Sequence, residues 1–185
     1  MNWADTPLFV YAAVEAHPAR SVVEAQFGRG DWASPVAALS DCYHVLTRNY
    51  EVAGPLAAAA VTRLGSLPFH WASFEARHLE PVVELRVRYG IEATDALLLL
   101  LSREDHGTLV TVDGRLLRAA RDEGVSSRNP ITPDLERAIG RWEAENLAPR
   151  GLRRLLRLVE RWLRERNAAV ADQFVEATAR LTTLP

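Results

Sequence analysis

The chain has 185 residues, 48% of them apolar, and a formal charge of −2 at pH 7. This composition allows one domain with some length to spare, and no stretch approaches the roughly 18 consecutive apolar residues of a membrane span. The first residues lack the basic-then-apolar pattern of a secretory signal, so we expect a cytoplasmic protein without a membrane partner. A single cysteine, Cys42, excludes an internal disulfide, and we interpret it as a helix core residue.

The first half of the sequence alternates short strand-like runs with helical segments. The strands are predicted at residues 2–5, in DWASP and in LPFHW. Helices are predicted at 7–16, at 19–27, from Ser34-Pro35 to about Tyr50, at 55–64 and at 73–89. Pro81 must break or kink the last of these helices.

The alternation continues to residue 128. IEATDALLLLLSREDHG is predicted to be a helix buried on most sides, because it contains five consecutive leucines. TLVTVD, residues 115–123 and residues 125–128 then read as strand, helix and strand. Strands separated by helices of this length favour a parallel sheet covered on both faces, with ligands bound at the carboxyl ends of the strands.

Aspartates occupy that edge of the predicted sheet. Asp5 ends the first strand and Asp113 ends TLVTVD, although either could be only a helix cap. Asp95 lies in the first turn of the leucine-rich helix, where it could simply complement the helix dipole. Asp41 lies among apolar residues in the middle of a helix, opposite a stripe that includes Tyr43, so it faces either a cleft rim or bulk water.

Four segments, in this order, carry a resemblance to a known family: ADTPLFVYA, SPVAALSDCYHVLTRNY, YGIEATDALLLLL and GTLVTVDGRLLRAARDEGV. Over residues 1 to 130 the chain resembles the PIN domain and, within it, the VapC-like ribonuclease toxins. The resemblance implies a parallel-sheet α/β/α sandwich that binds Mg²⁺ or Mn²⁺ and cuts RNA. The acids it assigns to catalysis and to the metal are Asp5, Asp41, Asp95 and Asp113.

Other features of the resemblance concern neighbouring positions. Thr6 and Thr111 match small hydroxyl residues beside the first and last acids of the family. The second acid is usually Glu, where this chain has Asp41, and Pro7 stands where the family commonly has a small polar residue.

The grouping of carboxylates has a physical reason that is independent of the family. Acids held close together raise each other's pKa unless a divalent cation neutralises them, and Mg²⁺ prefers hard oxygen ligands. A bound metal lowers the pKa of a water and stabilises charge on phosphate oxygens. The sequence therefore predicts phosphodiester hydrolysis.

The last part of the chain differs in charge. Residues 1–149 contain 14 arginines against 20 acidic residues, whereas residues 150–185 contain 8 arginines against 4. An amphipathic helix is predicted there, with one basic face that includes Arg150, Arg153, Arg154, Arg157 and Arg161. This helix could contact RNA, bind a second copy or an antitoxin, or pack its apolar stripe on the domain; a final helix at 168–181 could pair with it.

The sequence thus predicts a nuclease domain at 1–130 and a helical extension at 131–185. We expect a homodimeric, metal-dependent endoribonuclease, the toxin of a toxin-antitoxin pair, with Arg115 and the basic face as candidate RNA contacts. Two alternatives remain open: a catalytically degenerate RNA- or protein-binding module, and a housekeeping RNA-processing nuclease.

Overall fold

A computed structural model describes residues 1–147 and 152–182, without the side chains of 152–155, 157 and 179–182. Its five short strands are all parallel: β1 (Asn2–Ala4), β2 (Trp32–Pro35), β3 (His70–Ala72), β4 (Thr108–Val110) and β5 (Ser126–Arg128). They form one sheet in the order β3-β2-β1-β4-β5. The order reverses between β1 and β4, so the residues that follow these two strands lie side by side at the carboxyl edge of the sheet.

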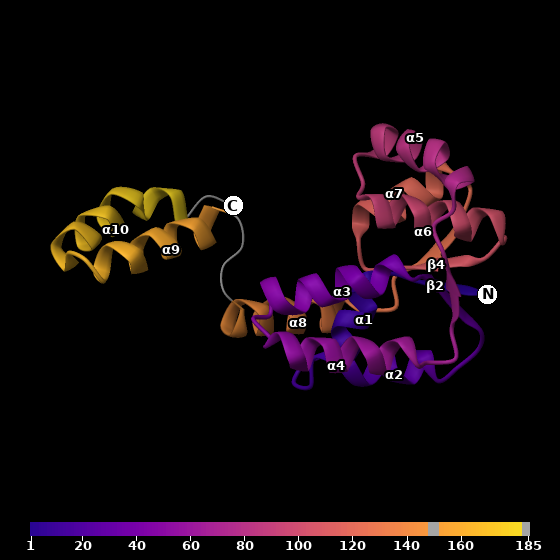
Figure 1. Ribbon diagram of the computed structural model, residues 1–185, viewed down its shortest axis with the longest axis horizontal. Helices are drawn as coiled ribbons and strands as arrows, with labels where there is room; N and C mark the ends of the chain where they lie inside the picture. Colours follow the sequence, from indigo (N-terminus) through magenta and orange to yellow (C-terminus); the bar gives the residue numbers. More distant parts are fainter. Residues whose placement is uncertain (148–151, 183–185) are drawn as a thin grey trace. The chain divides into compact units, whose positions relative to one another are not determined.

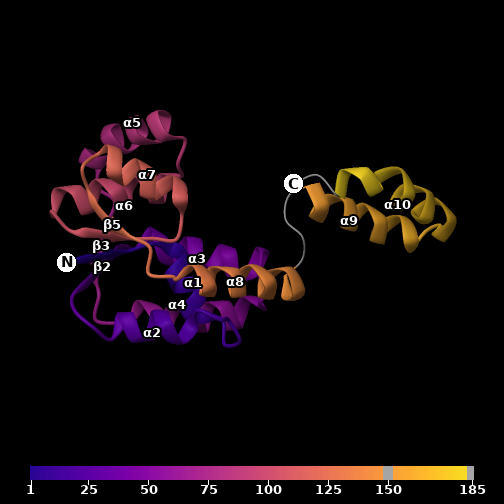
Figure 2. The ribbon, with the colours of Figure 1, turned by 180° about the vertical axis from the view of Figure 1, so that it is seen from behind.

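Helices cover both faces of this sheet (Figures 1 and 2). On one face lie α5 (Leu79–Tyr89), α6 (Ala93–Glu104) and α7 (Gly114–Asp122). On the other lie α1 (Thr6–Ala13), α2 (Arg20–Phe27), α3 (Ala37–Arg48), α4 (Gly54–Gly65) and α8 (Pro133–Asn146). This arrangement confirms the predicted parallel α/β/α fold.

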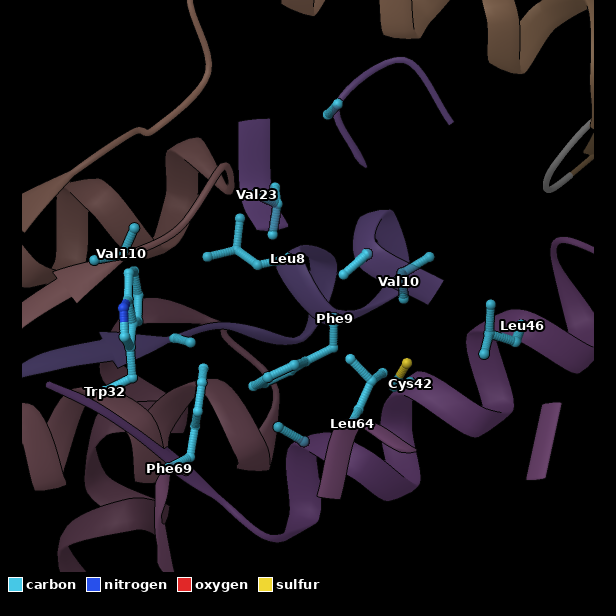
Figure 3. Packing of buried hydrophobic residues seen from close by; sticks show 14 of the residues in the cluster. Leu8, Phe9, Val10, Val23, Trp32, Cys42, Leu46, Leu64, Phe69 and Val110 are labelled. Atoms are coloured by element: carbon cyan, nitrogen blue, oxygen red, sulfur yellow. The ribbon is translucent and has the colours of Figure 1, made fainter. Parts of the chain in front are cut away.

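The two faces bury separate apolar clusters. Figure 3 shows the cluster around α1, in which Phe9 lies near Trp32 of β2, near Phe69, which precedes β3, and near Leu64 of α4. The opposite cluster is built mainly from the leucines of α6, five of which are at most 8% exposed. The predicted burial of the leucine-rich helix on most sides is confirmed, as is the core position of Cys42.

Three local predictions were wrong. Ser34 does not begin a helix: it lies in β2, where its hydroxyl donates to the Ala4 carbonyl at 2.9 Å, and α3 begins at Ala37. Within α3, the buried residues are Ala38, Cys42 and Leu46, whereas Tyr43 of the predicted stripe is only partly buried.

The third concerns Pro81, which neither breaks nor kinks a helix. It lies in the first turn of α5, where backbone N–H groups have no acceptor within the helix, so the missing N–H of proline removes no helical hydrogen bond. A short 3₁₀ turn (Ala76–His78) precedes α5.

The chain divides into two compact units, Met1–Glu143 and Ala144–Pro185. The boundary expected after residue 130 therefore falls inside the first unit, because α8 packs on its core through Ile139. Trp142 of α8 also meets the ring of His17 edge-on, with ring centres 5.2 Å apart.

The second unit is a helical hairpin. It consists of α9 (Leu152–Arg164) and α10 (Ala168–Thr182), which lie side by side in both views (Figures 1 and 2). Ala171 of α10 is fully buried in it. The predicted pairing of the last two helices is confirmed.

Candidate active site

Asp5 lies at the centre of the carboxyl edge. It follows β1, caps α1, and is 2% exposed. Its Oδ1 accepts from the Thr6 backbone N–H at 2.7 Å and its Oδ2 accepts from the Thr111 hydroxyl at 2.5 Å. Burial, assisted by the charges of Asp95 and Asp113, raises the pKa of Asp5 to about 7 despite these hydrogen bonds.

Thr111 links the ends of β1 and β4. Its side chain is fully buried, and its Oγ1 accepts from the backbone N–H of Asp113 at 2.9 Å while it donates to Asp5. One hydroxyl thus positions two of the predicted acids. Thr6 supports Asp5 only through its backbone N–H.

Asp113 is the exposed member of this edge. Its Oδ1 caps α7 by accepting from the N–H groups of Arg115 and Leu116 at 2.6 and 3.2 Å. The cap that the sequence offered as the alternative is therefore present. It does not remove the carboxylate from the site, because the charge of Asp113 acts on both Asp5 and Asp95.

Asp95 is partly buried in the first turn of α6. Its Oδ2 accepts weakly from the Glu92 backbone N–H at 3.4 Å. Burial raises the pKa of Asp95 to about 6, with further contributions from the charges of Asp113, Glu92 and Asp41.

Asp41 is partly buried in α3. Its charge contributes to the raised pKa of Asp95, so Asp41 belongs with the other three acids. We call Asp5, Asp41, Asp95 and Asp113 the acidic site. Glu92, the N-cap residue of α6, is a fifth carboxylate near this site and is not among the predicted acids. Its spacing of three residues before Asp95 is the signal that places it on the same turn.

The donors of the acidic site fit a hard divalent cation in kind. They are carboxylate oxygens. Burial and the neighbouring negative charges disfavour the ionised forms of Asp5 and Asp95, and a bound cation would offset both effects. Among the described residues, no three acidic, histidine or cysteine side chains are grouped closely enough to hold an ion alone. Mg²⁺ is normally bound by only one or two carboxylates together with water and phosphate, so a site for Mg²⁺ does not require three such side chains.

Of the arginines predicted to contact RNA, the structure describes the side chains of Arg115 and Arg161. Arg115 donates through Nη1 to the Gly90 carbonyl at 2.8 Å, which ties α7 to the loop before α6. Arg161 is exposed on α9. Arg150 lies outside the described residues, as do the side chains of Arg153, Arg154 and Arg157.

Comparison with known proteins identifies the family of this domain. The PIN domain family model matches residues 4–122, which is more than half of the chain and contains all four acids. No curated protein matches the chain. No helix in the described ranges is long and apolar enough to cross a membrane. The chain belongs to the PIN domain family, whose members are in general nucleases and so act on nucleic acid.

Proposed function

We propose that this protein is a metal-dependent endoribonuclease whose active site is the acidic site. The observation that carries the proposal is the convergence of acids from four separate segments, with the pKa values of Asp5 and Asp95 raised to about 7 and about 6. Uncompensated carboxylates that lie together lower the stability of a fold at neutral pH, so their presence at one edge favours a function that uses them. Perturbed pKa values of this kind cluster at functional sites.

Each residue has a distinct role in this proposal. Asp95 and Asp113 would bind Mg²⁺ or Mn²⁺, with Asp41 reaching the ion directly or through water. Asp5 holds the site together, because Thr111 and Thr6 already donate to both of its oxygens. When bound, the metal would supply an activated water and neutralise charge on the phosphate that is being cut.

The test is RNA cleavage by the purified full-length chain with Mg²⁺, Mn²⁺ or EDTA. Asp95→Asn and Asp113→Asn should abolish a cleavage that requires the metal, and Asp31→Asn serves as the control because Asp31 is an exposed acid at the opposite edge. Cleavage that persists in EDTA or in both site variants would contradict the proposal. A DNA substrate in parallel tests the preference for RNA.

A VapC-like toxin role is the finer part of the proposal. It rests on the order of the four sequence segments and includes a cytoplasmic location, a protein antitoxin and a homodimer. Growth arrest on expression in a bacterium, relieved by Asp95→Asn, would support it. Growth without arrest, together with RNA cleavage in vitro, would favour a housekeeping RNA-processing nuclease.

The basic face of α9 is proposed as a further RNA contact. Arg161 and Arg164 lie on this helix, although Arg164 is paired with Glu160 and Asp172 at 3.2 and 3.1 Å. Replacement of Arg153, Arg154 and Arg157 together should weaken RNA binding and its salt dependence. Unchanged affinity and salt slope would assign the helix to the hairpin alone.

A binding module without turnover is the second candidate. It is favoured by the observation that, in the described ranges, no three acidic, histidine or cysteine side chains are grouped closely enough to hold an ion. RNA binding without cleavage in any metal would identify this function.

A further inference from the structure

A basic pocket of about 410 Å³ lies beside the sheet on the face covered by α1 and α2. Its lining combines two arginines, one carboxamide, one indole and two small apolar residues: Arg29, Arg128, Gln26, Trp32, Val22 and Ala25. No carboxylate is among these lining residues. The pocket is therefore suited to an anion rather than to a cation or an apolar ligand.

The arginine of β5 is held in place by neutral partners. Arg128 donates through Nη1 to Gln26 Oε1 at 2.9 Å, and its guanidinium lies 5.9 Å from the centre of the Trp32 ring. The Trp32 indole N–H donates to the carbonyls of Gln26 and Arg29 at 3.1 and 2.9 Å, which fixes the end of α2 beneath the sheet. The floor of the pocket is thus built rather than formed by loose surface side chains.

The charge of the two arginines is not neutralised by the protein. Within the described ranges, neither Arg29 nor Arg128 forms an ion pair, whereas Arg88 and Arg103 each bind a carboxylate. Guanidinium groups match the geometry of phosphate oxygens and form two parallel hydrogen bonds with them. A phosphate would therefore supply the negative charge that the pocket lacks.

Only the β5 side of the pocket approaches the acidic site, because Trp32 begins β2 and Arg29 precedes it, so these two residues lie at the amino edge of the sheet. Arg128 is the last residue of β5 and pairs with Val110 of β4. Its carbonyl accepts from the backbone N–H of Thr111 at 3.2 Å, and Thr111 holds Asp5. Adjacent strands lie about 4.8 Å apart, so the backbone of Arg128 is one strand away from the end of β4, after which Asp113 follows.

We propose that Arg29 and Arg128 bind a backbone phosphate of single-stranded RNA whose scissile bond lies at the acidic site. This inference rests on the proposed nuclease function and specifies how the substrate strand runs, namely from the acidic site at the carboxyl edge along β5 toward the amino edge of the sheet. It makes these arginines substrate-positioning residues.

The test measures binding of a fluorescent single-stranded RNA oligonucleotide in the Asp113→Asn background, where cleavage is blocked. Arg29→Gln combined with Arg128→Gln should raise Kd about tenfold, equivalent to one charge-assisted contact. The slope of log Kd against log salt should decrease by about 0.7, the value for one phosphate on a single strand.

Two matched variants separate phosphate binding from a loss of packing in the pocket. Arg63→Gln removes an exposed arginine of α4 outside the pocket and should leave Kd and slope unchanged. Gln26→Ala removes the neutral partner of Arg128 but no charge, so it should leave the salt slope unchanged. Thermal unfolding of each variant checks that α2 remains in place.

The inference is overturned if the double variant has the Kd and slope of its parent, or if Gln26→Ala reproduces the whole effect. If the wild-type protein cleaves RNA and the double variant binds normally, only the pocket fails. If the wild type neither binds nor cleaves RNA, the proposed function fails and the inference fails with it.

Discussion

Carboxylates have opposite electrostatic surroundings at the two ends of α6 and α7. At their N-terminal ends, the charges of Asp95 and Asp113 raise the pKa of the buried Asp5, and the charge of Asp113 also raises the pKa of Asp95. At their C-terminal ends, Glu123 accepts from Arg88, Arg103 and the Tyr89 hydroxyl at 2.8, 2.5 and 2.7 Å.

The pKa of Glu123 shows the consequence. Its partial burial opposes the charge, but the hydrogen bonds from Tyr89, Arg103 and Arg88 outweigh burial and lower the pKa. The carboxylate at the C-terminal end is thus neutralised by two arginines, whereas in the described ranges no residue of the acidic site forms an ion pair. The same helices therefore carry a structural carboxylate at one end and, in our proposal, functional ones at the other.

The largest expected effect of this asymmetry is on activity. Asp113→Asn should reduce RNA cleavage at least about a hundredfold, because it removes a proposed metal ligand at a cost to transition-state charge stabilisation. Its stability should change little, since Asn caps a helix as well as Asp does. Single-turnover cleavage and thermal unfolding measure the two effects, and a variant that loses both equally would show that Asp113 is only a cap.

The second effect is on stability at the opposite end. Glu123→Gln should lower the free energy of unfolding by about 2 kcal/mol, because two guanidinium groups lose their counter-charge while the side chain remains only 10% exposed. Chemical denaturation measures it. RNA cleavage below the melting temperature should be retained, and Glu104→Gln, an exposed residue of α6, is the control.

The third effect has the opposite sign. Asp95→Asn, measured in EDTA at pH 7.5, should raise the free energy of unfolding by about 1 kcal/mol, because it removes a charge that the fold disfavours. A decrease in stability would mean that the charge of Asp95 is compensated in the metal-free protein.

The pH dependence follows from the same shift. The folded pKa of Asp95, about 6, lies above its ordinary value of 3.8, so the folded state binds more protons between these values. The contribution of Asp95 to stability should therefore fall as pH rises from about 4 to about 6. Burial lowers the pKa of His17 to about 4, which acts in the opposite direction over a similar range. The difference between wild type and Asp95→Asn removes the contribution of His17 and reports Asp95 together with its effect on Asp5, whose pKa the charge of Asp95 raises.

Much of the fold could be predicted from the sequence, because local patterns determine it. Gly90 has φ of 62° and ends α5 where a helix stop is predicted, and the alternation of strands and helices indicates the parallel sheet. Ser34 was misread because a hydroxyl before proline is typical of a helix start, and only the tertiary bond to Ala4 shows that it belongs to a strand. The packing of α8 depends on contacts between residues far apart in sequence, such as Trp142 and His17.

The acidic site shows the same division. The ends of two strands and the start of a helix are local patterns, and they are enough to single out Asp5, Asp95 and Asp113. Nothing local predicts that Thr111 links Asp5 to the Asp113 turn, because β1 and β4 are far apart in the sequence. The basic pocket depends on contacts between α2, β2 and β5, so the sequence offered no pattern for it.

The most direct test of the central claim is Mg²⁺ binding by calorimetry at pH 6.5, repeated in buffers of different ionisation enthalpy. Since the pKa values of Asp5 and Asp95 are about 7 and about 6, binding at the acidic site should release about one proton. Asp31→Asn should behave as wild type, and Asp95→Asn should bind weakly and release fewer protons. Absence of Mg²⁺ binding, or binding without proton release that Asp95→Asn leaves unchanged, would contradict the account.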